Sequence, residues 1–173
     1  MHPVGALDGW RFCPRCGAAL ETEDDHLRCS SCGERYWANA LPAVQALLER
    51  DGRVLLARRG IEPRLGEWDL PGGFVEEREP AEAAVRRELL EETGLELDSA
   101  ELMRIDIEPY GDRFVFSVTF SVTASGEPVA ADDVDELRWF DASELPSEMA
   151  FPGQDSVLRD WSRRQSGRIH SNE

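Results

Sequence analysis

Residues 73–95 read GFVEEREPAEAAVRRELLEETGL, and they contain the most strongly marked helix of the chain. Pro80 suits the first position of a helix, and the Ala-Glu-Ala-Ala run after it has high helix propensity. Gly94 stands where the glycine that ends a helix belongs, and acidic residues in the first turn suit the positive end of the helix dipole. The stretch therefore predicts a helix over residues 80–93.

Three carboxylates recur on this helix, at Glu88, Glu91 and Glu92. The i, i+3, i+4 spacing places them on one helical face, where like charges destabilise the helix unless something compensates them. Carboxylate oxygens are the ligands that Mg²⁺ and Mn²⁺ prefer, and such a metal neutralises a diphosphate and activates a bound water. The spacing therefore indicates a divalent-metal site. The alternative is an acidic face exposed to solvent.

Strand-like segments surround the helix, and Asp51-Gly52 between the first two of them is a two-residue hairpin signal. One helix among mixed strands favours an α+β fold or an α/β/α sandwich over a doubly wound sheet. We expect a closing helix over residues 150–164. The strands are predicted at residues 43–49, 53–59, 100–107, 114–123 and 136–140.

The four cysteines, Cys13, Cys16, Cys29 and Cys32, form two C-x2-C pairs that are each followed by glycine. Two such pairs a short distance apart are typical of a zinc site, and four thiolates leave no open position for water, so the metal is structural. The alternatives are two redox-active pairs or an iron–sulfur centre. His26 lies in the intervening loop, and we predict that it is exposed and not a ligand.

The formal net charge is −16, and all 19 basic residues are arginines. An acidic field repels nucleic acid and anionic membranes, so we predict neither as a partner; a bound metal would then attract an anionic substrate. No apolar run is long enough to span a membrane, and the first residues do not resemble a signal peptide. We therefore predict a soluble, cytoplasmic protein.

The sequence resembles the Nudix hydrolases, because residues 73–95 match G-x5-E-x7-R-E-U-x-E-E-x-G-U, in which U is aliphatic, at every defined position. The resemblance implies an α/β/α sandwich around a mixed sheet and hydrolysis of a nucleoside diphosphate linked to another group. It implies Mg²⁺ or Mn²⁺ bound by the Gly72 carbonyl, Glu88, Glu91 and Glu92, with Glu88 in some members also the base. It also implies that Arg87 orients Glu88 and that Glu79 supports the metal ligands, so the catalytic set is Glu79, Arg87, Glu88 and Glu91. A further acid outside residues 73–95, which we call the box, is expected among Asp132, Asp133, Asp135 and Glu136.

A zinc ribbon before a Nudix domain is similar to two groups of this family. The NADH pyrophosphatases carry S-Q-P-W-P-F-P-x-S after the box, and residues 104–113 do not match it. The ADP-ribose and FAD pyrophosphatases with a shorter ribbon resemble this chain better, over residues 58–63, 66–76 and 148–152. One departure is the position of Pro42, since those proteins usually have Tyr-x-Asn-Pro directly after the ribbon.

This resemblance predicts three parts: a zinc ribbon at residues 1–36, a Nudix domain at residues 37–166 and a polar tail at residues 167–173. The predicted activity releases AMP from ADP-ribose or FAD. The alternatives are hydrolysis of non-standard nucleoside triphosphates and a nucleotide-sensing regulator without activity. We expect a small nucleotide as the partner and, by resemblance, a homodimer. Candidate substrate-binding residues are Arg59, Arg64 and Phe74, whereas Trp68 is expected in the core.

Overall fold

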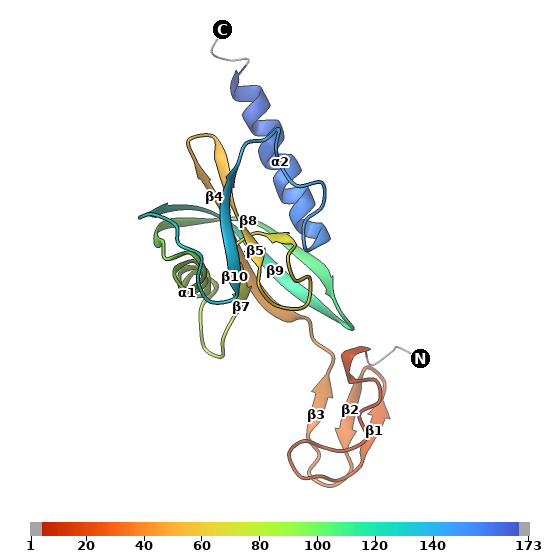
Figure 1. Cartoon of the computed structure of the whole chain (residues 1–173). Helices are drawn as coiled ribbons and strands as arrows, with labels where there is room; N and C mark the ends of the chain where they lie inside the picture. The colour runs from red at the N-terminus through yellow and green to blue at the C-terminus, as the bar shows by residue number, and fades with distance from the viewer. Residues whose placement is uncertain (1–4, 170–173) are drawn as a thin grey trace. The chain divides into compact units, whose positions relative to one another are not determined.

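The computed structural model describes residues 5–169 and the side chains of residues 5–166 (Figure 1). The chain divides into two compact units. The N-terminal unit runs to Leu41 and includes the hairpin tip Pro109–Phe114, whereas the second unit contains the rest of the chain. No helix in residues 5–169 is long and apolar enough to cross a membrane.

The N-terminal unit is built on a small antiparallel sheet whose strand order is β1-β2-β3. Its core is small, because Leu7 and Leu27 are its buried apolar cluster and Leu20 and Tyr36 pack against them. The elements are η1 (Gly5–Leu7), β1 (Leu20–Glu23), β2 (His26–Cys29) and β3 (Arg35–Trp37). These short strands lack a clear alternation of apolar and polar residues, and sequence patterns did not predict them.

The second unit contains the mixed sheet, with strand order β10-β5-β4-β9-β8. Two short strands extend it, since β6 pairs with β5 and β7 pairs with β4. All five predicted strands are present, and four are longer than expected. The strands are β4 (Leu41–Arg50), β5 (Arg53–Arg59), β6 (Trp68–Asp69), β7 (Gly72–Phe74), β8 (Glu96–Tyr110), β9 (Arg113–Ser125) and β10 (Val134–Phe140).

Two helices, α1 (Ala81–Thr93) and α2 (Pro152–Ile169), cover opposite faces of this sheet (Figure 1). Side chains alternate between the faces along a strand. On β4, Leu48 accordingly belongs to the same buried cluster as Leu89 of α1, whereas Leu47 belongs to the cluster that includes Val157 of α2. The predicted α/β/α sandwich is therefore confirmed.

The helix boundaries differ from the sequence-based expectation by one residue at the start of α1, and they also differ at both ends of α2. α1 ends as predicted, at Gly94, whose φ of 68° and N–H bond to the Leu90 carbonyl close the helix. α2 starts at Pro152 and continues to Ile169, so the first residues of the expected polar tail are helical. The remaining tail residues, 170–173, lie outside the described part of the chain.

Candidate functional site

The turn into the box requires glycine because two other groups approach its backbone. A Cβ on Gly72 would lie 2.2 Å from the Val44 carbonyl oxygen of β4. A Cβ on Gly73 would lie 2.5 Å from the carboxylate of Glu88. Close approach, rather than an ordinary turn alone, therefore accounts for the Gly-Gly pair, and it brings the Glu88 carboxylate against the backbone of β7.

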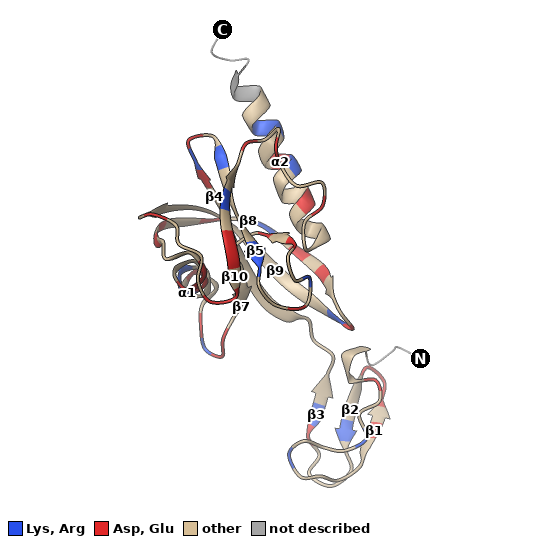
Figure 2. Ribbon diagram, in the orientation of Figure 1, with Lys and Arg blue, Asp and Glu red and all other residues tan. Residues whose placement is uncertain are grey.

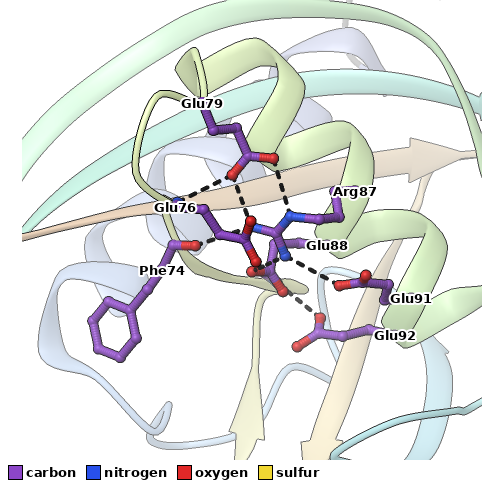
Figure 3. Close-up of polar contacts among 8 residues, drawn as sticks. Phe74, Glu76, Glu79, Arg87, Glu88, Glu91 and Glu92 are labelled. Carbon is purple, nitrogen blue, oxygen red and sulfur yellow. Dashed lines mark hydrogen bonds and ion pairs between the residues drawn. The ribbon is translucent and has the colours of Figure 1, made fainter.

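Arg87 connects the loop before α1 with the carboxylates on the helix (Figure 3). Its Nε and Nη2 donate to the two carboxylate oxygens of Glu79 at 3.0 and 2.9 Å. Its Nη1 donates to Glu88 at 2.8 Å and to Glu91 at 3.1 Å, and Nη2 also donates to the Phe74 carbonyl at 3.1 Å. Such a bidentate, charge-assisted pair is strong and directional. Arg87 therefore supplies the compensating charge that a cluster of glutamates needs, and it holds the pKa of Glu79 below its usual value.

Glu88 and Glu92 differ from exposed glutamates because both lie against β7, where Glu92 is buried and the side chain of Glu88 is only 12% exposed. Glu92 is 7% exposed and accepts the Gly72 N–H at 2.8 Å. Burial raises the pKa of Glu92 to about 9, and the nearby charges of Asp69, Asp133 and Glu88 act in the same direction. Burial also raises the pKa of Glu88, although Arg87 opposes that shift. A solvated acidic face does not describe this part of α1.

The carboxylate oxygens of Glu88, Glu91 and Glu92 do not all lie close to one another in this structure. Among the described residues, one group of three or more His, Cys, Asp or Glu side chains has all its ligand atoms within 4.8 Å of one another. That group is the four cysteines, and the glutamates of α1 do not form another. Arg87 bonds to both Glu88 and Glu91, and the side chain of Glu91 is 49% exposed. The carboxylate of Glu91 is thus open to solvent, and the oxygen donors of Glu88 and Glu91 are of the kind that a hard divalent ion prefers.

Among the acids expected outside the box, Asp133 is the one whose negative charge raises the pKa of both Glu88 and Glu92. Its carbonyl accepts the Gly60 N–H at 2.6 Å, which fixes the loop before β10. Glu136 instead pairs with Arg58 at 3.5 Å. Figure 2 shows acidic residues at the start of β10 and a basic residue further along the strand.

The candidate substrate-binding residues differ in how exposed their side chains are and in which partners they bind. The guanidinium of Arg59 donates to Asp69 at 2.7 Å and to the Pro63 carbonyl at 2.8 Å, and its side chain is only 14% exposed. Arg59 is therefore held by Asp69, and its contact with a substrate phosphate stays a prediction. Arg64 is half exposed and pairs with Glu67 at 3.6 Å. Phe74 is exposed, and its ring points away from the carboxylates in Figure 3.

Packing residues follow the sequence-based expectation. The ring of Trp68 meets Phe140 edge to face at a centroid distance of 4.9 Å. Trp139 packs against the cluster on the α1 face, and Phe140 is buried in the cluster on the α2 face. These aromatic residues therefore belong to the core.

Sequence reasoning missed a chain of buried polar side chains that links Asp69 to α2. Gln154 donates to Asp69 and to the amide oxygen of Gln45, the latter at 2.9 Å. Gln45 in turn donates to the hydroxyl of Thr119 at 2.7 Å. Burial raises the pKa of Asp69, although Gln154 and Arg59 oppose that shift. No local pattern could have revealed this chain, because its members come from four separate segments.

The cysteine cluster of the N-terminal unit has the compactness of a metal site. The sulfur atoms of Cys13 and Cys32 are 3.8 Å apart, and those of Cys16 and Cys29 are 3.5 Å apart. Four thiols at this separation fit one tetrahedral ion of the zinc type. His26 lies outside this group of sulfur atoms, and its side chain is only 13% exposed, contrary to the expected exposure, because its ring stacks on Trp37.

The two units match two family models. A model described as the NUDIX domain matches residues 40–161, and one described as the NADH pyrophosphatase zinc ribbon domain matches residues 11–37. The chain is 36% identical over 138 residues to the ADP-ribose pyrophosphatase of Methanocaldococcus jannaschii, covering 77% of this chain and 79% of that protein. It is also 31% identical over 154 residues to the NAD-capped RNA hydrolase NudC of Pseudomonas aeruginosa, covering 86% of this chain. That alignment spans 53% of the hydrolase, so the chain accounts for about half of its length.

Solved structures of the same kind share the fold. A NUDIX hydrolase from Nitrosomonas europaea superposes with a TM-score of 0.72 at 25% identity, and the alignment covers 93% of each chain. A MutT NUDIX hydrolase from Burkholderia pseudomallei gives a TM-score of 0.62 at 32% identity, covering 70% of this chain and 97% of the other.

Proposed function

This chain belongs to the Nudix hydrolase family, and we propose that it hydrolyses an ADP-linked diphosphate such as ADP-ribose or FAD, with release of AMP, using Mg²⁺ or Mn²⁺. The observation that carries the proposal is the arrangement around Arg87, which connects Glu79, Glu88 and Glu91 while Glu92 is held at Gly72. The ADP-ribose pyrophosphatase relative, whose alignment covers 77% of this chain and 79% of that protein, supports the substrate class.

Each residue of the site then has a role. Glu88, Glu91, Glu92 and the Gly72 carbonyl would hold the metal, with Asp133 as the acid from outside the box. When bound, the metal would neutralise the diphosphate and activate a water molecule. Glu88 suits the role of general base, since burial raises its pKa and a more basic carboxylate accepts a proton more readily. Arg87 would position Glu88, and Glu79 would position Arg87.

The substrate would contact residues near the rim of this site. We assign Phe74 to stacking against a ring of the substrate, because its side chain is exposed while its backbone carbonyl accepts a hydrogen bond from Arg87 at the edge of the site. Arg64 is the candidate for a phosphate contact, since its ion pair with Glu67 is long and exposed. Arg59 would act indirectly, by holding Asp69.

The cysteine cluster would hold a structural Zn²⁺. Four sulfur ligands complete a tetrahedral shell and leave no position for a reacting water. The small apolar core of the N-terminal unit makes such a metal the main source of its stability.

A second candidate substrate is a dinucleotide of the NAD type. The 31% identity to the NAD-capped RNA hydrolase favours it. Because that relative is named for an RNA substrate, the absence of a nucleic-acid partner stays a prediction for this chain. The homodimer likewise stays a prediction, which light scattering of the purified chain would measure.

The experiment is hydrolysis of a substrate panel (ADP-ribose, FAD, NADH and nucleoside triphosphates) with Mg²⁺ or Mn²⁺, with products separated by chromatography. We expect AMP from ADP-ribose or FAD. AMP from NADH alone would favour the second candidate, and pyrophosphate from a triphosphate would indicate a sanitation enzyme. Nucleotide binding without any product would indicate a sensor.

A pair of variants tests the assigned base. Glu88→Gln should reduce turnover by on the order of 10²- to 10⁴-fold, the usual contribution of a general base. Glu82→Gln, at an exposed position in the first turn of the same helix, is the matched control and should retain full turnover. Near-normal turnover in a folded Glu88→Gln protein would remove Glu88 from this role.

A further inference from the structure

Tyr36 lies beside the cysteine cluster, and its ring is fixed by the packing of the N-terminal unit. It stands on β3 directly opposite Leu27 of β2, and it packs against the buried pair Leu7 and Leu27. The ring of Trp10 lies against it with the centroids 6.1 Å apart. The ring therefore has little freedom to move, and its hydroxyl is held 3.1 Å from the sulfur of Cys13.

The chemistry of a metal-bound cysteine sets the direction of this contact. A thiolate ligand carries no proton, so the phenolic hydroxyl of Tyr36 must donate and the Cys13 sulfur must accept. Four thiolates around one divalent ion leave an excess of negative charge, and hydrogen bonds to sulfur spread that charge. Cys13 is only 2% exposed, so water cannot provide this stabilisation.

The hydroxyl also distinguishes the two buried sulfurs. The sulfur atoms of Cys13 and Cys29 each accept hydrogen bonds from backbone N–H groups two and three residues further along the chain, as expected for two equivalent C-x2-C turns. Within the described residues, Cys13 receives an additional hydroxyl from a side chain. Cys16 and Cys32 are exposed to solvent.

We propose that Tyr36 is a positioning residue of the zinc site, whose hydroxyl donates to the Cys13 thiolate and slows loss of the metal. The inference rests on the proposed zinc at the four cysteines. Groups that hydrogen-bond to metal ligands commonly change metal affinity by about 10- to 100-fold when removed. Tyr36→Phe removes the hydroxyl and keeps the ring that packs on Leu27.

The test measures zinc transfer from the full-length, zinc-loaded protein to a chromophoric chelator. We expect Tyr36→Phe to release zinc about 10-fold faster than the unmodified protein. Ser30→Ala is the matched control, because the Ser30 hydroxyl also lies in the ribbon but donates to the Ala19 carbonyl at 3.0 Å rather than to a sulfur. The control should release zinc at the original rate.

A second readout locates the effect on one sulfur. Peptide mass spectrometry after brief alkylation of the zinc-loaded protein should show that Tyr36→Phe accelerates modification of Cys13 more than modification of Cys29. Unchanged zinc release in Tyr36→Phe, or equally fast release in Ser30→Ala, would overturn the role of Tyr36. A purified protein without any zinc would instead refute the metal assignment itself, so the two failures are distinguishable.

Discussion

Glu92→Gln tests whether the metal-free protein holds a proton on a buried carboxylate. Glu92 is 7% exposed, and burial raises its pKa from 4.5 to about 9. In the unfolded chain the same group loses its proton near its usual value. Between these two pKa values the folded protein binds a proton that the unfolded chain does not, so the free energy of unfolding must fall as the pH rises.

One bound proton corresponds to a slope of about 1.4 kcal/mol per pH unit. Other buried acids, such as Asp69 and Glu108, add to the slope in both proteins, so the informative quantity is the difference between variant and unmodified protein. From about pH 6 to about pH 8, Glu92→Gln should gain up to about 3 kcal/mol relative to the unmodified protein. The glutamine retains an oxygen that can accept the Gly72 N–H.

The assay is urea unfolding in buffer without added Mg²⁺ or Mn²⁺ and without a chelator, so that a metal bound at the four cysteines is retained, at several pH values across this range. Glu91→Gln is the matched control, because the Glu91 side chain is 49% exposed on the same helix, and its slope should equal that of the unmodified protein. Adding Mg²⁺ should stabilise the unmodified protein more than Glu92→Gln. The same slope in Glu92→Gln as in the unmodified protein would refute the reasoning.

Gly73→Ala should lower turnover on the order of 10²-fold without unfolding the protein, because the added Cβ would lie 2.5 Å from the Glu88 carboxylate and displace it. Gly52→Ala is the control and should retain turnover in the same assay, because a Cβ at Gly52 would have no atom within 4 Å. Trp161→Phe removes the indole N–H bond to Glu49 at 2.9 Å, and urea unfolding should report a loss of about 2 kcal/mol. Zinc chelation should abolish protection from amide hydrogen exchange in the N-terminal unit, whereas the sheet of the second unit should keep its protection.

Features that depend on local spacing could be predicted from the sequence. The limits of α1 depend on Pro80 and Gly94, which act on the backbone of their own segment. The cysteine cluster is equally local, because each C-x2-C knuckle places two sulfurs together before the rest of the chain folds. The Nudix domain and the zinc ribbon before it were therefore recognisable without coordinates.

Contacts between distant segments were decided by tertiary structure alone. Glu91 and Glu92 are adjacent residues of one type, yet Glu92 is buried because β7 packs over it and Glu91 remains half exposed. The sequence does not show that Asp69 binds the guanidinium of Arg59, nor that Asp69 also contacts Gln154, 85 residues away in the chain. The sequence determines which side chains can ionise or donate a hydrogen bond. Burial and contacts with other segments determine whether those side chains are charged and which partner they bind.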